Sequence, residues 1–234
     1  MSKGGRLRPR FDRAPGPLES VRLQRVREAV LWPRERFRIR RFRLRGSVGP
    51  PPPLVKRRRL IDLANRCGIS TVVETGTYLG DTTAYLASRG IHVVTIELEP
   101  GLAARARRRF AGHPLVTVLE GDSGTVLRNL VASLEVPALF WLDGHFSGGV
   151  TARGGTDSPI VQELEAIVSS PHGPGSVILI DDARCLGGEA YPSLAEVRAL
   201  LSVGNWTVGP VVDDAIEVLP AGMQSSPQGC RDER

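Results

Sequence analysis

Cysteine and long apolar segments are both scarce in this sequence. The three cysteines, Cys67, Cys185 and Cys230, are scattered and do not have the spacing of a zinc site. This usage favours reduced thiols in a cytoplasmic protein. No apolar run approaches the roughly 18 residues of a membrane span, and the first residues lack the apolar segment of a secretory signal. We therefore expect a cytoplasmic protein that does not span a membrane.

Two nucleotide-binding signatures are absent as well. Gly76 and Gly80 have three residues between them, so they do not form the dinucleotide fingerprint G-x-G-x-x-G. The sequence also contains no G-x-x-x-x-G-K-S/T segment, which argues against a P-loop that binds ATP. A dinucleotide or an ATP site of these kinds is therefore not expected.

Acidic residues are rare at the start of the chain. Residues 1–60 contain 19 of the 31 Lys and Arg residues but only 4 of the 25 acidic residues, a formal charge of +15. Residues 61–234 consequently carry a formal charge of −9. The overall charge of +6 thus describes a basic arm joined to a mildly acidic domain.

Residues 1–53 form this Arg- and Pro-rich arm, which is predicted to be partly disordered. A short helix is predicted to end at Pro33, and residues 34–45 nearly alternate between apolar and cationic, as in an amphipathic strand or an adhesive unfolded segment. Pro50 to Pro53 predict a stiff, extended spacer. Two interpretations of the arm remain. It binds an anionic partner, which is either a nucleic acid or a membrane surface, or it only keeps the protein in solution.

Residues 54–219 are predicted to form one α/β domain, and residues 220–234 a loose tail. Strands rich in β-branched residues alternate with helices, which indicates a mostly parallel sheet covered on both faces, with a terminal antiparallel hairpin. The expected strands are residues 71–73, 91–97, 115–119, 138–143, 176–182, 206–211 and 215–218. The expected helices are residues 54–67, 81–88, 100–110, 125–134, 159–169 and 194–201.

The stretch from Thr71 to Thr83 organises this domain. A buried strand ends at an acid, Glu74, and two glycines then turn the backbone into a helix that Asp81 can cap. Strand, glycine turn and helix form a cofactor site in α/β proteins, because the backbone N–H groups of the turn and the helix face the ligand. An acid before the turn disfavours a pyrophosphate and favours a cationic amino-acid or sulfonium group.

Acids follow each of five consecutive predicted strands. The carboxyl ends of parallel strands share one edge of the sheet, so we expect a rim of carboxylates there. Glu97 suits the diol of a ribose, and Asp122 suits an adenine amino group. The six acids of the rim are Glu74, Glu97, Asp122, Asp143, Asp181 and Asp182.

Three of these acids, Asp143, Asp181 and Asp182, follow two strands that we expect to be neighbours. Three carboxylates in one place repel each other unless a cation lies between them. Oxygen ligands of this kind suit Mg²⁺. Such an ion would hold a substrate hydroxyl and lower its pKa.

This arrangement resembles the class I S-adenosylmethionine-dependent methyltransferases over roughly residues 55–219. The carriers of the resemblance are the segment from Glu74 to Gly80, the acid Glu97, the segment Gly121-Asp122-Ser123 and the acid Asp143. The resemblance implies a doubly wound, Rossmann-like sheet of seven strands and S-adenosylmethionine as the cofactor. The cofactor-binding residues it implies are Glu74, Gly76, Thr77, Tyr78, Gly80, Glu97, Asp122 and Ser123.

The strand-end acids further resemble those of the metal-dependent sugar O-methyltransferases of the macrocin type. In that family an acid ends the fourth strand and an acid pair ends the fifth, matching Asp143, Asp181 and Asp182. The family's general base is an acid two residues after the first of these, where this chain has His145, whose imidazole can also accept a proton. Arg153, in the glycine-rich loop that follows, could hold the substrate.

Three functions remain open from the sequence. The first is Mg²⁺-assisted transfer of a methyl group to a hydroxyl of a small molecule or sugar. The second is methylation of RNA or another nucleic acid that the basic arm anchors, although Leu142-Asp143-Gly144-His145 replaces the N/D-P-P-F/Y motif of base amino methylation. The third is a binding protein that keeps the cofactor fold without methyl transfer.

Overall fold

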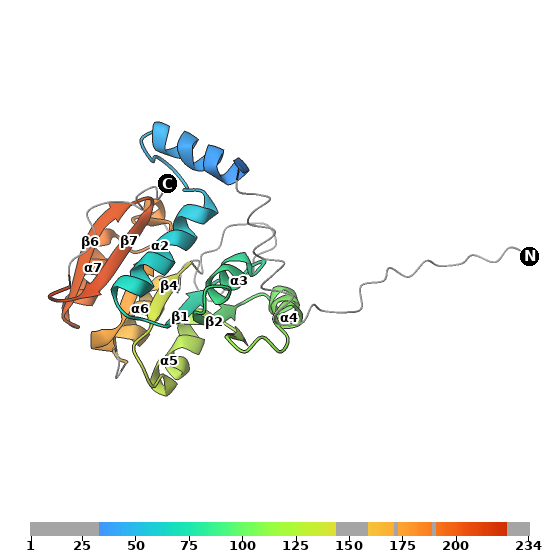
Figure 1. Ribbon diagram of the computed structural model, residues 1–234. Coiled ribbons are helices and arrows are strands. Elements are labelled where there is room, and N and C mark those ends of the chain that lie inside the picture. Colours follow the sequence, from blue (N-terminus) through green and yellow to red (C-terminus); the bar gives the residue numbers. More distant parts are fainter. Residues whose placement is uncertain (1–32, 144–158, 171–172, 189–190, 224–234) are drawn as a thin grey trace, which may run out of the picture.

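The computed structural model describes residues 33–143, 159–170, 173–188 and 191–223. Its seven strands form one sheet in the order β3-β2-β1-β4-β5-β7-β6 (Figure 1). Strands β1 to β5 are parallel, and β7 runs antiparallel to both β5 and β6. The strands are β1 Thr71–Thr75, β2 His92–Glu97, β3 Val116–Glu120, β4 Leu139–Leu142, β5 Val177–Ile180, β6 Trp206–Val212 and β7 Ala215–Pro220. The predicted doubly wound sheet with a terminal hairpin is confirmed.

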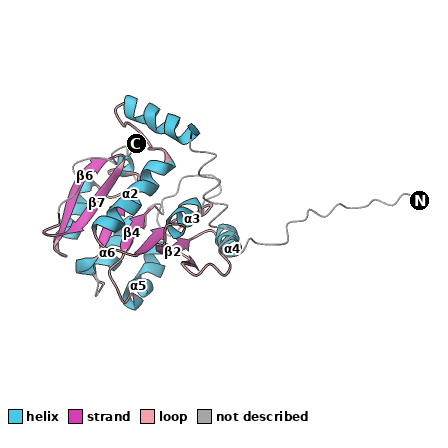
Figure 2. Cartoon of the chain, in the orientation of Figure 1, coloured by secondary structure: helices cyan, strands magenta, loops and turns pink. Residues whose placement is uncertain are grey.

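Helices cover both faces of this sheet (Figure 2). They are α2 Pro53–Arg66, α3 Asp81–Ala87, α4 Pro100–Arg109, α5 Ser123–Ser133, α6 Ile160–Val168 and α7 Leu194–Ser202, with short 3₁₀ turns at Gly173–Gly175 and Ala183–Cys185. One apolar cluster joins the sheet to α5, α6 and α7, and a second joins it to α2 and α3. Within the described ranges, no helix has the length and apolarity that a bilayer crossing requires.

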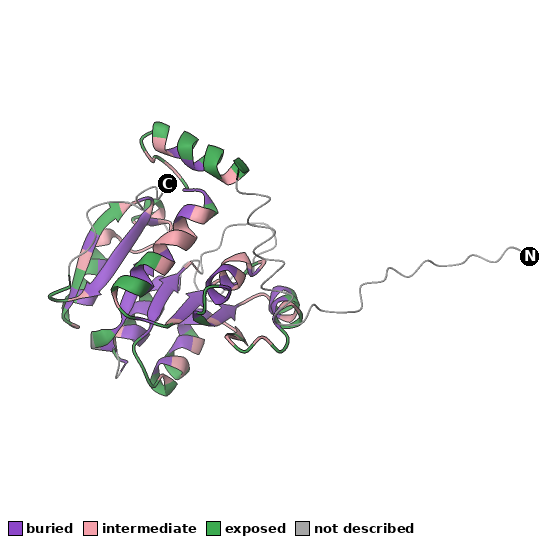
Figure 3. Cartoon of the chain, in the orientation of Figure 1, coloured by how far each residue is buried: buried purple, intermediate pink, exposed green. Residues whose placement is uncertain are grey.

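The central strands are buried on both sides, as Figure 3 shows. In β4, Leu139 and Trp141 pack in the cluster with α2 and α3, whereas Phe140 and Leu142 pack in the cluster with α5 to α7. This alternation is the two-residue period of a strand. A strand apolar at every position is thus explained by two covered faces, and the carboxyl end of β4 is held in a fixed place.

Residues 33–44 form a helix, so the predicted amphipathic strand or unfolded segment is wrong. Pro33 is helical, and proline is tolerated in the first turn of a helix. The inward side chains are Glu35, Ile39, Phe42 and Arg43, at helical rather than alternating spacing. The predicted helix that ends at Pro33 lies outside the described residues.

This N-terminal helix, blue in Figure 1, is tied to the last hairpin of the sheet. The Arg43 guanidinium donates to both carboxylate oxygens of Asp213, at 2.5 and 2.8 Å, in the turn between β6 and β7. Farther along, Arg59 and Arg66 of α2 pair with Glu217 of β7. Arg43 of the basic arm therefore neutralises an acid of the domain, as Arg59 and Arg66 of α2 also do.

Candidate functional site

The turn after β1 requires glycine. Gly76 and Gly80 have φ of 86° and 74°, in the left-handed region where other residues are strained. A Cβ atom at Gly80 would lie 2.8 Å from Cε2 of Phe110. Tyr78, between them, also has a positive φ of 50°, and its side chain is half exposed at the turn. The backbone thus leaves β1 by a tight turn and enters α3 at Gly80.

Glu74, at the end of β1, lies beneath this turn. Its side chain is buried, and the Thr83 hydroxyl of α3 donates to it. Burial raises the pKa of Glu74 to about 7, although hydrogen bonds from Thr83 and Thr95 favour the charged form. The carboxyl group therefore fastens α3 to β1, and its predicted contact with a cofactor stays a prediction.

Glu97 and Thr77 connect β2 to the glycine turn. One oxygen of Glu97 accepts the N–H of Tyr78 at 2.7 Å, and the other accepts the N–H of Glu99 at 3.0 Å. The hydroxyl of Thr77 lies 2.6 Å from that of Thr95 in β2. Glu97 is consequently oriented next to the turn, as an acid that binds a ribose would need to be.

The segment after β3 places Asp122 and Ser123 at the start of α5. Asp122 caps this helix by accepting the N–H of Thr125 at 3.1 Å, and its side chain is partly exposed. Ser123 is buried and donates to Oε1 of Glu163 at 2.6 Å. Both residues therefore have structural contacts in addition to their predicted place beside a cofactor.

Glu163, in α6, was not identified from the sequence. It is fully buried, and its Oε2 has no hydrogen-bond partner among the described residues. Burial raises its pKa to about 7, although hydrogen bonds from Ser123 and Thr75 oppose this. Ile160 and Leu164 lie on the same buried face of α6. The sequence signal that could have identified Glu163 is the presence of an acid on the apolar face of this helix.

Asp143, Asp181 and Asp182 come together, as the sequence predicted. Strands β4 and β5 pair directly, with Leu142 opposite Ile180, so the acids that follow them are neighbours. One oxygen from each carboxylate lies within 4.8 Å of the other two. Burial and the neighbouring Asp181 carboxylate raise the pKa of Asp143 well above its usual range. The cluster concentrates negative charge at the carboxyl edge of the sheet.

Lys56, on the first turns of α2, lies in this cluster and was missed by the sequence reasoning. Its Nζ donates to Oδ2 of Asp181 at 2.5 Å and to Oδ1 of Asp182 at 3.1 Å. Burial lowers the pKa of Lys56, but the carboxylates of Asp181 and Asp143 outweigh it and raise this pKa. The ammonium therefore stays charged.

Arg184 is the second cation of the cluster. It donates to Oδ1 of Asp182 at 2.9 Å, the oxygen that Lys56 also contacts, and it pairs with Asp214. Burial alone would raise the pKa of Asp182, but Lys56 and Arg184 outweigh this effect and lower it. Asp182 is therefore held ionised.

Two predicted residues, the base His145 and the substrate-binding Arg153, lie outside the described residues.

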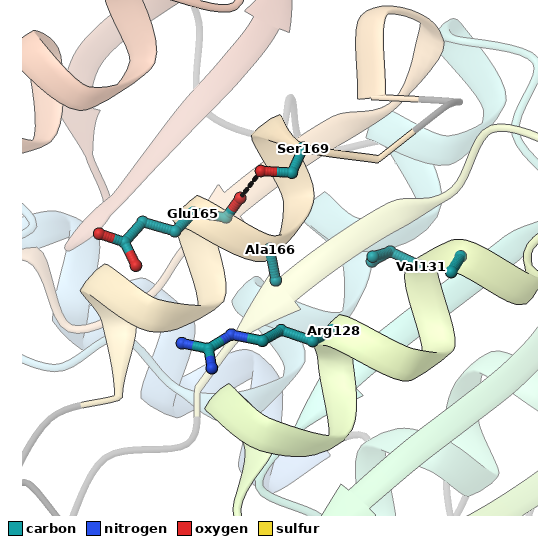
Figure 4. Close-up of a pocket in the computed structure, with 6 residues that line it drawn as sticks. Arg128, Val131, Glu165, Ala166 and Ser169 are labelled. Atoms are coloured by element: carbon teal, nitrogen blue, oxygen red, sulfur yellow. Dashed lines mark hydrogen bonds between the residues drawn. The ribbon is translucent and has the colours of Figure 1, made fainter.

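A groove lies away from the acid cluster, between the later turns of α5 and α6 (Figure 4). It has a volume of about 470 Å³ and is lined by Arg128, Val131, Ala132, Glu165, Ala166 and Ser169. Because these helices run back from the carboxyl edge of the parallel strands, the groove is not part of the candidate site.

Comparison with known proteins gives partial similarities. No family model matches the chain. A segment is 40% identical over 80 residues to a ribosomal RNA small subunit methyltransferase A of Acidobacterium capsulatum, covering 34% of this chain and 27% of that protein. The enzyme of the same name from Geobacter sulfurreducens is 41% identical over 87 residues, covering 30% and 32%. The matches thus span about a third of the length of these methyltransferases.

Solved structures of similar shape are distant in sequence. A putative caffeoyl-CoA O-methyltransferase from Staphylococcus aureus has a TM-score of 0.48 and 14% identity, covering 84% of this chain and 97% of that one. An SAH-bound O-methyltransferase from Bacillus cereus has a TM-score of 0.49 and 20% identity, covering 70% and 79%. At this distance neither structure identifies a substrate. The sheet of five parallel strands with β7 antiparallel between β5 and β6, and the glycine turn at its carboxyl edge, form the doubly wound, Rossmann-like arrangement that the sequence predicted.

Proposed function

We propose that the chain is an S-adenosylmethionine-dependent O-methyltransferase that acts on a hydroxyl group of a small molecule or sugar, with Mg²⁺ assistance. The observation that carries this proposal is the cluster of Asp143, Asp181 and Asp182 at the same edge of the sheet as the glycine turn of β1. A carboxylate cluster in that place can hold a hydroxyl group next to a methyl donor. An enzyme that methylates a base of a nucleic acid would not require such a cluster.

The turn and the first two strands would bind the cofactor. The glycine turn lies at the carboxyl edge of the sheet, where ligands of such folds bind, although the N–H groups of Gly76, Tyr78 and Gly80 already donate to Ile96, Glu97 and Thr77. Both oxygens of Glu97 already accept one hydrogen bond each, but a carboxylate oxygen has a second lone pair for a ribose hydroxyl. Asp122 and the half-exposed Tyr78 would contact the adenosine part.

The acid cluster fits a divalent cation. It offers oxygen atoms alone, the donor type that Mg²⁺ prefers. The ammonium of Lys56, 2.5 and 3.1 Å from two of the carboxylates, is a cation that already occupies the cluster. When bound, the metal ion would supply positive charge that stabilises a deprotonated substrate hydroxyl.

The protein would mainly align the reactants, since methyl transfer depends on geometry. The acceptor oxygen forms a bond to the methyl carbon while the carbon–sulfur bond of the cofactor breaks. The hydroxyl proton passes to His145, the predicted base. Thr75 would keep the two halves of the site in register, because its hydroxyl accepts the N–H of Asp143 at 3.2 Å and so joins the end of β1 to the metal-binding acid.

Substitution of the acid pair tests the metal part of this proposal. The double variant Asp181→Asn, Asp182→Asn keeps the volume of the side chains and removes two negative charges. We expect it to lose methyl transfer to a panel of hydroxylated acceptors, and EDTA to abolish transfer by the unsubstituted protein. Transfer that survives both the substitution and EDTA would contradict a metal-assisted mechanism but leave cofactor binding untouched.

Methylation of a nucleic acid is the second candidate. The specific observation is the exposed face of the helix 33–44, on which Arg34, Arg40 and Arg41 point to solvent while Arg43 fixes the helix beside the carboxyl edge of β5. A basic surface next to the site could hold a phosphate backbone. The similarity to ribosomal RNA methyltransferases agrees with this candidate.

A further inference from the structure

Lys56 and a metal ion would need the same place in the acid cluster. The ammonium contacts Asp181 at 2.5 Å and Asp182 at 3.1 Å, two of the three expected ligands. Mg²⁺ binds carboxylate oxygens at about 2.1 Å, so an ion held by the same oxygens would lie next to Nζ. Two cations at that separation repel each other strongly, and more so away from bulk water.

We propose that Lys56 is a built-in competitor of the metal ion: its ammonium fills the acid cluster in the metal-free protein and leaves it when the ion binds. The inference rests on the proposed function, because it takes the cluster to be the metal site. It adds that the metal affinity is set by a residue of α2, outside the strand-end acids.

Lys56 can leave the cluster without a rearrangement of the fold. Its backbone is fixed, since the neighbouring Val55 and Leu60 of α2 are buried in the domain. Its side chain is 19% exposed, so a path to solvent exists, and four rotatable bonds allow it to swing out. Arg184 is a poorer competitor, because its guanidinium is also held by Asp214.

The charges of the cluster favour the exchange. Asp214 shares Arg184, so four carboxylates carry up to four negative charges against the two positive charges of Lys56 and Arg184. A divalent cation in place of the ammonium adds one positive charge and leaves less negative charge unbalanced, while Arg184 stays in place. The lysine thus keeps the acids from repelling each other in the empty state and yields to an ion of higher charge.

Metal binding to the full-length protein tests this proposal without reference to activity. Mn²⁺ binding is followed by electron paramagnetic resonance for the unsubstituted protein and for the variants Lys56→Met and Lys56→Arg. Lys56→Met removes the competing charge, and we expect it to bind Mn²⁺ about tenfold more tightly or better, whereas Lys56→Arg should gain nothing. Arg108→Met, which removes one exposed positive charge from α4, is the control for net charge.

A gain in Lys56→Met that disappears when Asp182→Asn is added would locate the ion in this cluster. Equal or weaker Mn²⁺ binding by Lys56→Met would overturn the proposal. Circular dichroism of each variant shows whether it is folded, because loss of Lys56 leaves three acids with less compensation.

A second measurement needs no substitution. The chain has two lysines, Lys3 and Lys56, so amine labelling followed by peptide mass spectrometry reports on Lys56 with Lys3 as the internal reference. We expect Mg²⁺ to increase labelling of Lys56 several-fold and to leave Lys3 unchanged. Labelling of Lys56 that stays constant or falls with Mg²⁺ would overturn the proposal. Binding of S-adenosylhomocysteine in metal-free buffer is measured in parallel, so a failure of the methyltransferase proposal is distinguished from a failure of this one.

Discussion

Arg43 and Asp213, 170 residues apart in sequence, form a two-pronged ion pair that fastens the N-terminal helix to the last hairpin of the sheet. The Asp213 side chain is 4% exposed, and its backbone has a positive φ of 47° in the turn between β6 and β7. The arginine therefore pairs with an acid that has little access to water. A segment that by composition resembles a solubilising tail is anchored at one defined point.

Replacing Arg43 by methionine should release this helix. Because Asp213 would lose its charged donor while remaining shielded from water, we expect the protein to lose about 1–3 kcal/mol of unfolding free energy. Urea denaturation measures the loss, and limited proteolysis should show faster cleavage within residues 33–44. Arg41→Met, at an exposed position of the same helix, is the control. Equal stability of the two variants would show that the ion pair does not hold the helix.

Gly80→Ala should be more harmful than Gly90→Ala. Both glycines have left-handed backbones, with φ of 74° and 82°, so both substitutions introduce similar backbone strain. At Gly80 the new methyl group also meets the ring of Phe110, whereas at Gly90 it meets no atom within 4 Å. We expect losses of about 2–4 kcal/mol at Gly80 and about 1 kcal/mol at Gly90.

Thermal denaturation compares the two glycine variants, and calorimetry with S-adenosylhomocysteine shows whether the altered turn still binds the cofactor product. We expect weaker binding for Gly80→Ala alone. Equal losses of stability would mean that Phe110 moves aside and that the turn is not constrained by it.

Glu163 should make the protein less stable as the pH rises. Its pKa in the folded state, about 7, is above the ordinary value of 4.5, so the folded protein holds a proton that the unfolded chain has released. Its contribution is therefore complete below about pH 4.5 and is lost progressively up to about pH 7. Glutamine cannot ionise. In Glu163→Gln the free energy of unfolding should therefore fall by about 2–3 kcal/mol less over this pH range than in the unsubstituted protein.

Urea denaturation at pH 5 to 8 follows this effect, with the exposed Glu165→Gln of the same helix as the control. Buried Glu74 has the same direction of pKa shift, so part of the decline should remain in the Glu163 variant. A curve for Glu163→Gln that is parallel to that of the unsubstituted protein would show that Glu163 is not protonated on folding.

The sequence predicted the sheet well because its signal is local. The strands that begin near Thr71, His92 and Val177 are rich in β-branched residues, and each expected strand and helix of residues 54–219 is found with its ends shifted by at most a few residues. The meeting of Asp143 with Asp181 was also predictable, since it follows from two adjacent parallel strands. The order of strands and helices along the chain was sufficient to predict both the sheet and the meeting of these acids.

The missed features depend on contacts between distant segments. Lys56 belongs to a run of cations that is typical of a solvated helix face, and only the packing of α2 brings it to acids 125 residues away. The segment 33–44 was interpreted as alternating because its arginines were all expected to face solvent. Arg43 instead points inward and pairs with Asp213, which its charge does not reveal. Glu163 was overlooked as an ordinary helix acid, although it lies on an apolar face.

The exposed arginines offer a test between the two acceptor classes. If the acceptor is RNA, the triple variant Arg34→Gln, Arg40→Gln, Arg41→Gln should bind RNA less tightly and with a shallower dependence on salt, by about one unit of slope for each phosphate that is no longer neutralised. Arg105→Gln with Arg108→Gln, on exposed positions of α4, is the control for charge. Filter binding at several salt concentrations measures the slopes. Unchanged RNA binding, together with transfer to a small hydroxylated acceptor, would favour the first candidate.

Binding of the cofactor product is the most direct test that this chain uses S-adenosylmethionine. Isothermal titration of the full-length protein with S-adenosylhomocysteine requires no knowledge of the acceptor and tests the proposed cofactor site, which the turn from Gly76 to Gly80 and Glu97 would form. We expect saturable binding of one molecule per chain, weakened by Glu97→Gln, whose amide is a poorer acceptor for ribose hydroxyls. No heat and no thermal shift at millimolar S-adenosylhomocysteine would contradict this expectation.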